Sequence, residues 1–179
     1  MLEDQWLLMR FKRGSDEAFS RIYAKYRAFL LRLAVAMLHD PQSAEDVVHD
    51  VFLHLVQFPQ RIALGGSLKA FLRTCVLNGV RSRMRREKVR SHVQLNEGLA
   101  GDARRPDQWV VFDEESQRVL AALAQVPVEQ REAVVLRLHG DMTFRQIAAM
   151  YGVPIATVQS RYRYGLDKLR SIMNGKVSP

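Results

Sequence analysis

The stretch of residues 143–170, TFRQIAAMYGVPIATVQSRYRYGLDKLR, most constrains the fold because it reads as two short helices around a tight turn. Thr143 predicts the N-cap of the first helix, and Gln146 three residues later completes a capping box. Gly152 predicts its left-handed end, and Pro154 predicts the start of the second helix. A helix-turn-helix can place its second helix in the major groove of DNA, although many helical hairpins without a DNA partner share this pattern.

The second of these helices has an apolar side and a polar, basic side. Apolar residues at helical spacing predict a buried face, formed by Val158, Tyr162, Gly165 or Leu166, and Leu169. The candidate DNA-facing residues are those that project elsewhere, namely Gln159, Ser160, Arg161, Arg163 and Tyr164.

The composition favours a folded protein with a polyanionic partner. A net charge of +8 points towards a polyanion, and a hydrophobic content of 47% is sufficient for a core. Cys75 is the single cysteine, which excludes an intramolecular disulfide and favours a reducing compartment. No apolar run approaches the ~20 residues that span a bilayer, and the N-terminus lacks the order of a signal peptide. We therefore predict a soluble, cytoplasmic protein without membrane insertion.

Helical periodicity and caps recur along the whole chain. Ser15, Ser43 and Ser67 each predict the N-cap of an amphipathic helix, and two further helices are expected from Glu114 to about Val126 and over residues 128–138. Residues 91–108 carry glycines and a proline with little periodicity, which is typical of a linker. The chain is therefore predicted to be all-α, with two small helical domains (1–92 and 113–175) joined by a flexible linker (93–112).

The helix that follows Ser43 is acidic although the protein is basic. It carries Glu45, Asp46 and Asp50, and no Lys or Arg occurs between Asp40 and Gln60. Such a helix should not face DNA. Its charges form either a solvated face or a docking surface for a basic protein partner, and the residues alone leave both open.

The helix that follows Ser67 ends in a dense run of cations. Arg81, Arg83, Arg85, Arg86, Lys88 and Arg90 are opposed only by Glu87. Compensation of the helix dipole needs fewer cations than this, so contact with phosphates is favoured over a solvated tail. Cys75 lies within the apolar stripe of this helix and is interpreted as a small buried hydrophobe.

Residue patterns for catalysis or cofactor binding are lacking in the sequence. There is no phosphate-binding glycine loop, the five histidines are dispersed, and one cysteine cannot build a structural zinc site. No Ser/His/Asp arrangement stands out. We expect no catalytic residues, no metal and no cofactor, and hence no enzyme.

Taken in order, these segments resemble the extracytoplasmic-function (group 4) sigma factors of bacterial RNA polymerase, in the sigma-70 family. In the first domain the resemblance rests on AEDVVHDVFLHL (44–55) and SLKAFLRTCVLNGVRSRMRR (67–86). In the second it rests on VPVEQREAVVLRLHGDMTFRQIAAMYGVPIATVQSRYRYGLDKLR (126–170).

The resemblance implies a promoter-specificity subunit with sigma regions 2 and 4 and no catalysis of its own. Its partners would be core RNA polymerase (the clamp helices and flap), promoter DNA and, as a family expectation, an anti-sigma factor. Residues matching the clamp-binding motif are Asp46, Asp50, Phe52 and Leu55. Those matching the region that melts and reads the −10 element, together with loop 58–67, are Asn78, Arg81, Arg85 and Arg86. Those on or beside the −35 recognition helix are Arg137, Thr157, Gln159, Ser160, Arg161 and Arg163.

Residues in both domains and in the linker depart from the family pattern; in the linker, Arg104 and Arg105 stand where relatives are often acidic. Gln159 stands where a basic residue is common, and His49 replaces a common Gln. Gly165 replaces the usual Ala, at a cost of about 1 kcal/mol in helix propensity. The alternative hypothesis is a helix-turn-helix regulator that binds duplex DNA without polymerase, and a DNA-cutting enzyme such as a recombinase is a third. A gel shift with and without core polymerase separates the first two.

Overall fold

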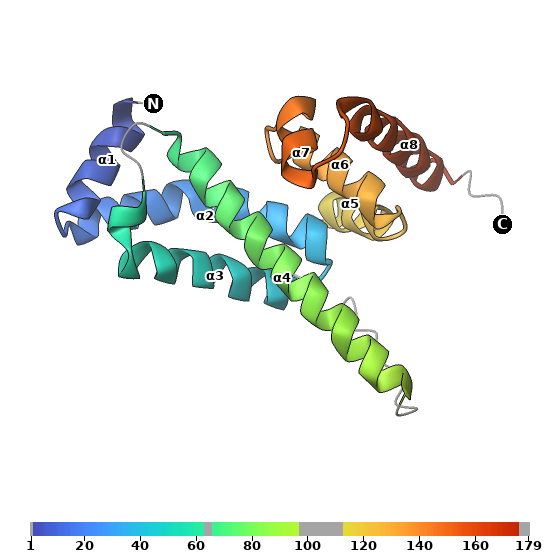
Figure 1. The fold of residues 1–179 in the computed structure, drawn as a ribbon, viewed down its shortest axis with the longest axis horizontal. Helices are drawn as coiled ribbons and strands as arrows, with labels where there is room; N and C mark the ends of the chain where they lie inside the picture. The colour runs from blue at the N-terminus through green and yellow to red at the C-terminus, as the bar shows by residue number, and fades with distance from the viewer. Residues whose placement is uncertain (1, 63–65, 97–112, 176–179) are drawn as a thin grey trace. The chain divides into compact units, whose positions relative to one another are not determined.

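The computed structural model describes residues 2–62, 66–96 and 113–175. Every regular element in these ranges is a helix, and no strand occurs among them (Figure 1). The all-α prediction is therefore confirmed. The chain divides by its contacts into two compact units, one of residues 1–34 and 42–104 and the other of residues 35–41 and 105–179.

The predicted domain limits stay a prediction, but the helix before the linker is longer than expected. Helix α4 (Leu68–Asn96) continues past the predicted limit at residue 92. No glycine or proline follows Gly79 until Gly98, so no residue breaks the helix at the predicted point. Residues 97–112 of the predicted linker lie outside the described residues.

Local side-chain caps begin two helices of the first unit. The Ser15 hydroxyl accepts a 3.3 Å hydrogen bond from the amide of Ala18 in α2 (Asp16–Leu38). The Ser67 hydroxyl accepts a bond of the same length from the amide of Ala70 in α4. Both predicted caps are confirmed.

The predicted cap at Ser43 is wrong. Helix α3 (Pro41–Gln57) begins at Pro41, where a missing N–H costs nothing because the first amides of a helix have no intrahelical partner. Ser43 lies inside the helix, is buried, and accepts a 2.8 Å hydrogen bond from Arg83 Nη2. The helix ends before Phe58, as predicted, and a short 3₁₀ turn, η1 (Pro59–Arg61), follows.

Helix α1 (Leu2–Lys12) is an element that the sequence analysis did not predict. Leu7 and Leu8 bury its inner side, each at 1% exposure. Lys25 Nζ in α2 donates to Glu3 Oε2 at 2.6 Å and to Asp4 Oδ1 at 2.8 Å. These contacts to a distant segment hold a helix whose own periodicity is weak.

Apolar side chains from α2, α3 and α4 form the core of the first unit. Fully buried members include Ile22, Leu30, Leu72, Val76 and Val80, and Val48 is nearly so. Phe52 of α3 packs its ring 4.7 Å from that of Tyr23 in α2 and edge-on to Phe19. Burial of each such side chain stabilises the fold by about 1.5–3 kcal/mol.

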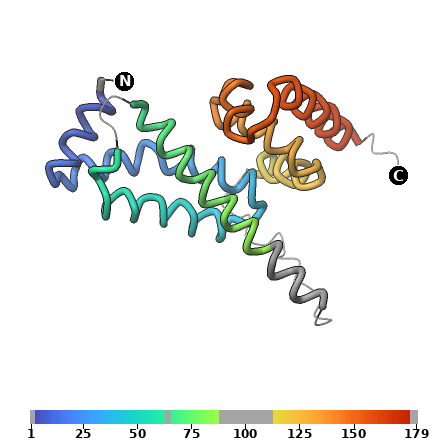
Figure 2. Tube along the Cα trace, in the orientation of Figure 1, coloured from blue at the N-terminus to red at the C-terminus, as the bar shows by residue number. Residues whose placement is uncertain are grey.

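Among the described residues, four whole helices lie in the second unit: α5 (Glu114–Ala124), α6 (Val128–Leu138), α7 (Phe144–Tyr151) and α8 (Ile155–Met173) (Figure 2). The Thr143–Gln146 capping box is present at the start of α7. Gly152 ends α7 with φ of +64°, a left-handed conformation that glycine adopts without strain. Pro154 then immediately precedes α8. The predicted helical hairpin is confirmed.

Candidate nucleic-acid and protein interface

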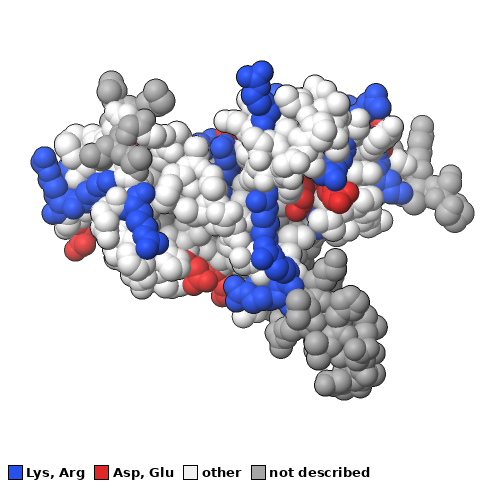
Figure 3. Space-filling model, viewed as in Figure 1, with Lys and Arg blue, Asp and Glu red and all other residues white. Residues whose placement is uncertain are grey.

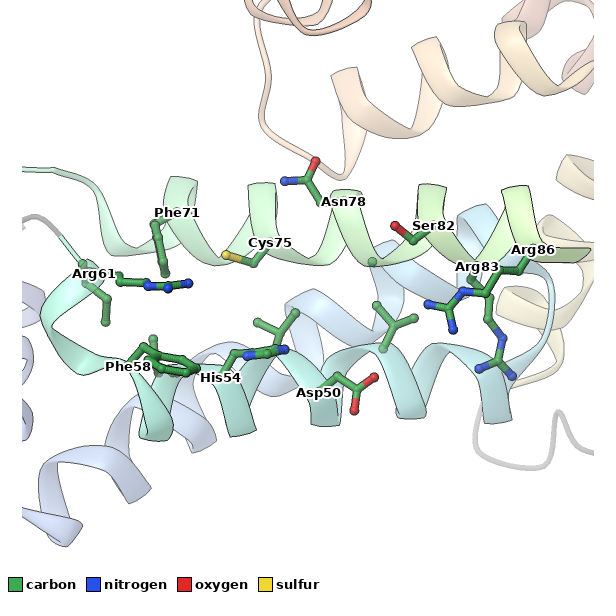
Figure 4. A pocket seen from close by; sticks show the side chains of 15 residues that line it. Asp50, His54, Phe58, Arg61, Phe71, Cys75, Asn78, Ser82, Arg83 and Arg86 are labelled. Carbon is green, nitrogen blue, oxygen red and sulfur yellow. The ribbon is translucent and has the colours of Figure 1, made fainter.

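A groove of about 560 Å³ runs between α3 and α4 in the first unit (Figure 4). Its floor lies where the two helices approach each other closely. A Cβ atom added at Gly79 would stand 2.8 Å from Val47 Cγ1, so only glycine allows this spacing. Asp50 and His54 line the groove from α3, and Asn78 and Arg86 line it from α4.

One end of the groove is aromatic and basic. The Arg61 guanidinium lies 4.6 Å from the ring centre of Phe58, and the His54 ring stacks on Phe58 at 6.2 Å with an angle of 24°. Phe71 closes this end from α4 (Figure 4). Aromatic rings beside cations are the surface on which unpaired nucleobases stack.

The residues predicted to contact the −10 element divide into two pairs. Asn78 and Arg86 are exposed and line the groove. Arg81 is half-buried and Arg85 is exposed, and neither lines it. Asn78 and Arg86 therefore line the same groove at separate points along α4, and the other two residues lie outside it.

Cys75 forms part of the groove wall. Its side chain is half-buried, which is less than the sequence analysis expected of a core residue. Burial raises the pKa of the Cys75 thiol, so the neutral thiol is favoured there.

The residues predicted to bind core polymerase lie on two different sides of α3. Asp46 and Asp50 are exposed, as the prediction requires. Phe52 and Leu55 are each 3% exposed and pack in the core of the unit, so neither offers a side chain to a partner in this structure. Phe52 and Leu55 therefore expose no surface that could contact a partner as predicted.

The outward face of α3 carries other residues that the sequence analysis did not select. Leu53 and Val56 are 45% and 49% exposed, and His49 is exposed beside them. Figure 3 shows acidic side chains over α3 next to basic side chains over the middle of α4. Spacing by three and four residues, which puts Asp46, His49, Leu53 and Val56 on one face, could have identified this stripe.

In the second unit, aromatic rings hold the predicted −35 residue Arg137 at the N-terminal end of α7. Its guanidinium lies 5.4 Å from the ring centre of Phe144. Phe144 in turn meets Tyr162 of α8 edge-on at 5.2 Å. Arg137 is exposed, so its charged end remains accessible to an anion.

The predicted contact residues on α8 differ in exposure. Gln159 and Arg163 are exposed, whereas Thr157, Ser160 and Arg161 are half-buried. Arg161 Nη2 lies 3.3 Å from Glu129 Oε2 of α6, so an ion pair already engages this side chain. Arg163 packs on the neighbouring Tyr164 at 5.1 Å.

Gly165 allows α8 to lie directly against α6. A Cβ atom at this position would stand 2.8 Å from Val134 Cγ2 and 2.9 Å from the carbonyl oxygen of Gln130. The departure from Ala that the sequence showed therefore has a packing reason. The helix that carries Gln159 and Arg163 is positioned by this close contact.

Metal-ligand clusters and membrane-spanning helices are both lacking in the ranges that the structure describes. No group of three His, Cys, Asp or Glu side chains there is placed to hold a metal ion. No helix among the described residues combines the length and apolarity needed to cross a membrane.

Comparison with known proteins gives matches to both units. Residues 22–90 match the family model described as Sigma-70 region 2, and residues 122–171 match Sigma-70, region 4. The chain is 29% identical over 175 residues to the ECF RNA polymerase sigma factor SigK of Mycolicibacterium vanbaalenii, covering 93% of this chain and 87% of that protein. It is 28% identical over 162 residues to the ECF RNA polymerase sigma factor RpoE of Cereibacter sphaeroides, covering 88% and 85% respectively.

A solved structure is also similar. It is the sigma factor RpoE of Bartonella quintana in complex with the anti-sigma factor NepR, with a TM-score of 0.63 and 26% identity. The similarity covers 86% of this chain and 97% of that one.

Proposed function

Since the chain belongs to the extracytoplasmic-function group of the sigma-70 family and is a sigma factor, we propose that it recruits core RNA polymerase to promoters by recognising −10 and −35 elements. The observation that carries this proposal is that both sigma regions are present in order. The first has exposed carboxylates on α3, and exposed arginines lie on α4 and α8. The protein acts in the cytoplasm with the polymerase. It supplies promoter specificity, and the polymerase supplies catalysis.

Docking on polymerase uses the exposed face of α3. Support comes from the solvent-exposed carboxylates of Asp46 and Asp50, with the apolar Leu53 and Val56 on the same helix. Acidic side chains beside an apolar patch suit a basic helical partner, and the clamp helices of the largest subunit are the partner that the family implies. The second unit contacts the flap.

The groove between α3 and α4 receives the unpaired non-template strand of the −10 element. Phe58 and Arg61 offer a stacking surface at one end, and Asn78 offers an amide that can hydrogen bond to a base edge. Arg86 lies along the groove as a phosphate contact. The exposed Arg85 adds positive charge near the strand.

Helix α8 reads the −35 element in the major groove, with its exposed Gln159 and Arg163 as the base contacts. Arg137 contacts a phosphate beside it, which positions the helix without reading sequence. Arg161 supports the helix through Glu129.

The experiment that tests this function is run-off transcription and core binding with purified core polymerase. Asp46→Arg and Asp50→Arg are expected to abolish both activities, because each places a cation against a basic partner. Glu17→Arg, at an exposed carboxylate on α2 that pairs only with Arg10 in the contacts described, is the matched control and should retain both activities. Normal transcription by the Asp46→Arg, Asp50→Arg double variant would refute the docking surface.

A gel shift separates this function from that of a stand-alone regulator. A sigma factor should bind a specific promoter tightly only with core polymerase present. Tight specific binding by the isolated chain would favour the regulator. An anti-sigma factor, as seen with RpoE of Bartonella quintana, would compete with polymerase for the first unit, and core binding in its presence should fall.

A further inference from the structure

Arg83 of α4 contacts two residues of α3, the helix that carries the proposed docking surface. Its Nη2 donates to Ser43 Oγ at 2.8 Å, and its Nη1 lies 3.5 Å from Asp46 Oδ2. The Ser43 side chain is buried, whereas that of Asp46 is 55% exposed. The same guanidinium therefore has a fixed anchor inside the protein and a second partner at the surface.

Arg83 also belongs to the groove. It lines the groove together with Arg86, three residues further along α4, and Gly79, four residues before it. Residues at this spacing share one side of a helix. A phosphate held by Arg86 would thus lie on the side of α4 from which Arg83 projects.

The contact between Arg83 and Asp46 is weak enough to be exchanged. Arg83 is 29% exposed and Asp46 is 55% exposed, so water screens the pair, and its oxygen–nitrogen distance is long. An exposed ion pair changes an equilibrium constant by at most about five-fold. A phosphate, or a partner's cation that takes Asp46, can therefore replace either member.

We propose that Arg83 is an additional contact to the phosphate backbone of the opened strand, which Asp46 holds back while the chain is free. This inference rests on the proposed function, because it requires the groove to bind single-stranded DNA and Asp46 to meet a cation of the polymerase. Docking engages Asp46 and frees Nη1 of Arg83 for the strand, while Nη2 stays on Ser43. Polymerase binding and strand binding then favour each other, as the reciprocity of coupled sites requires.

The first experiment uses the full chain without polymerase and a short fluorescein-labelled oligo-dT, with anisotropy as the readout. Asp46→Asn is expected to tighten binding by about two- to five-fold, the range that loss of an exposed ion pair allows. Glu45→Gln is the matched control: it removes the same charge from the adjacent residue, whose partner is Arg27 of α2, outside the groove. It should give a smaller gain.

A second variant identifies Arg83 as the source of that gain. In an Arg83→Ala background, the gain in oligo-dT affinity from Asp46→Asn should no longer exceed the gain from Glu45→Gln. Circular dichroism of Arg83→Ala checks the fold, and Arg83→Lys retains the charge if the alanine variant unfolds. The proposal is overturned if Asp46→Asn gains no more than its control, or if the extra gain persists without Arg83.

The release step is tested by comparing the free chain with the holoenzyme. Arg83→Ala should weaken DNA binding more in the holoenzyme, and lower the slope of log affinity against log salt there by about 0.7. Equal losses in the two states would overturn the release. Core binding by Asp46→Asn is measured separately. It tests whether Asp46 docks on polymerase, whereas the oligo-dT measurements test whether Asp46 restrains Arg83, so the two failures are distinguishable.

Discussion

Replacement of Gly165 by alanine should destabilise the second unit, although helix propensity alone predicts the opposite. In a helix interior, alanine is favoured over glycine by about 1 kcal/mol. At this position the added methyl group would meet Val134 Cγ2 at 2.8 Å and the Gln130 carbonyl oxygen at 2.9 Å. A side chain can sometimes turn away, but valine is stiff at χ1 and a backbone carbonyl cannot move without its helix.

The magnitude follows from these two opposing terms. Forcing an extra methyl group into a packed contact costs about 1–3 kcal/mol. Subtracting the propensity gain of about 1 kcal/mol leaves a net loss of ~0–2 kcal/mol for Gly165→Ala, with the backbone contact favouring the upper half. For a unit of this size, each kcal/mol lowers the melting temperature by about 4–8 °C.

Urea unfolding followed by circular dichroism measures this loss. Lys168→Gly, at an exposed position of the same helix, gives the propensity term by itself and should cost about 1 kcal/mol. A promoter footprint should show weaker protection at −35, because a displaced α8 carries Gln159 and Arg163 with it. If packing had no cost, Gly165→Ala would be more stable than the wild type by the propensity gain of about 1 kcal/mol. That result would refute the packing argument.

Three other predictions concern the second unit. Gly152→Ala should cost about 1–2 kcal/mol, because no atom lies within 4 Å of the added methyl group and only the left-handed backbone is penalised; Gly152→Asn should cost less in the same urea titration. Glu129→Gln should change stability by less than about 1 kcal/mol yet alter −35 affinity, measured by footprinting, since it releases Arg161. The Ser116 amide holds the pKa of Asp113 below its usual range, so this carboxylate stabilises the fold above its unfolded pKa. That stability should fall as acid titrates it through the lower folded pKa, and Asp113→Asn should remove this part of the pH dependence of unfolding.

The hairpin of α7 and α8 was predictable from the sequence because its signals are local. The hydroxyl of Thr143, the side chain of Gln146 and the left-handed Gly152 each act within one turn of the chain. The caps at Ser15 and Ser67 were identifiable for the same reason.

Features that depend on distant contacts were missed. Helix α1 is held by Lys25, and Ser43 was assigned as a cap although its partner, Arg83, lies on another helix. The apolar residues of α3 form a stripe too wide to show which edge faces outward. Packing of Phe52 against Tyr23 fixes which edge of α3 faces the core. Leu53 and Val56 are therefore the exposed apolar residues.

The contact of Gly79 with Val47 has a mechanical consequence. The Val47 side chain of α3 packs directly against the backbone of α4 at Gly79, so a side chain added at position 79 must displace Val47 or push the helices apart. Under the proposed function α3 contacts polymerase and α4 contacts DNA, so a shift of one helix would reach the other through this contact. A larger residue at position 79 should therefore change the spacing between the helix proposed to dock and the helix proposed to bind the strand.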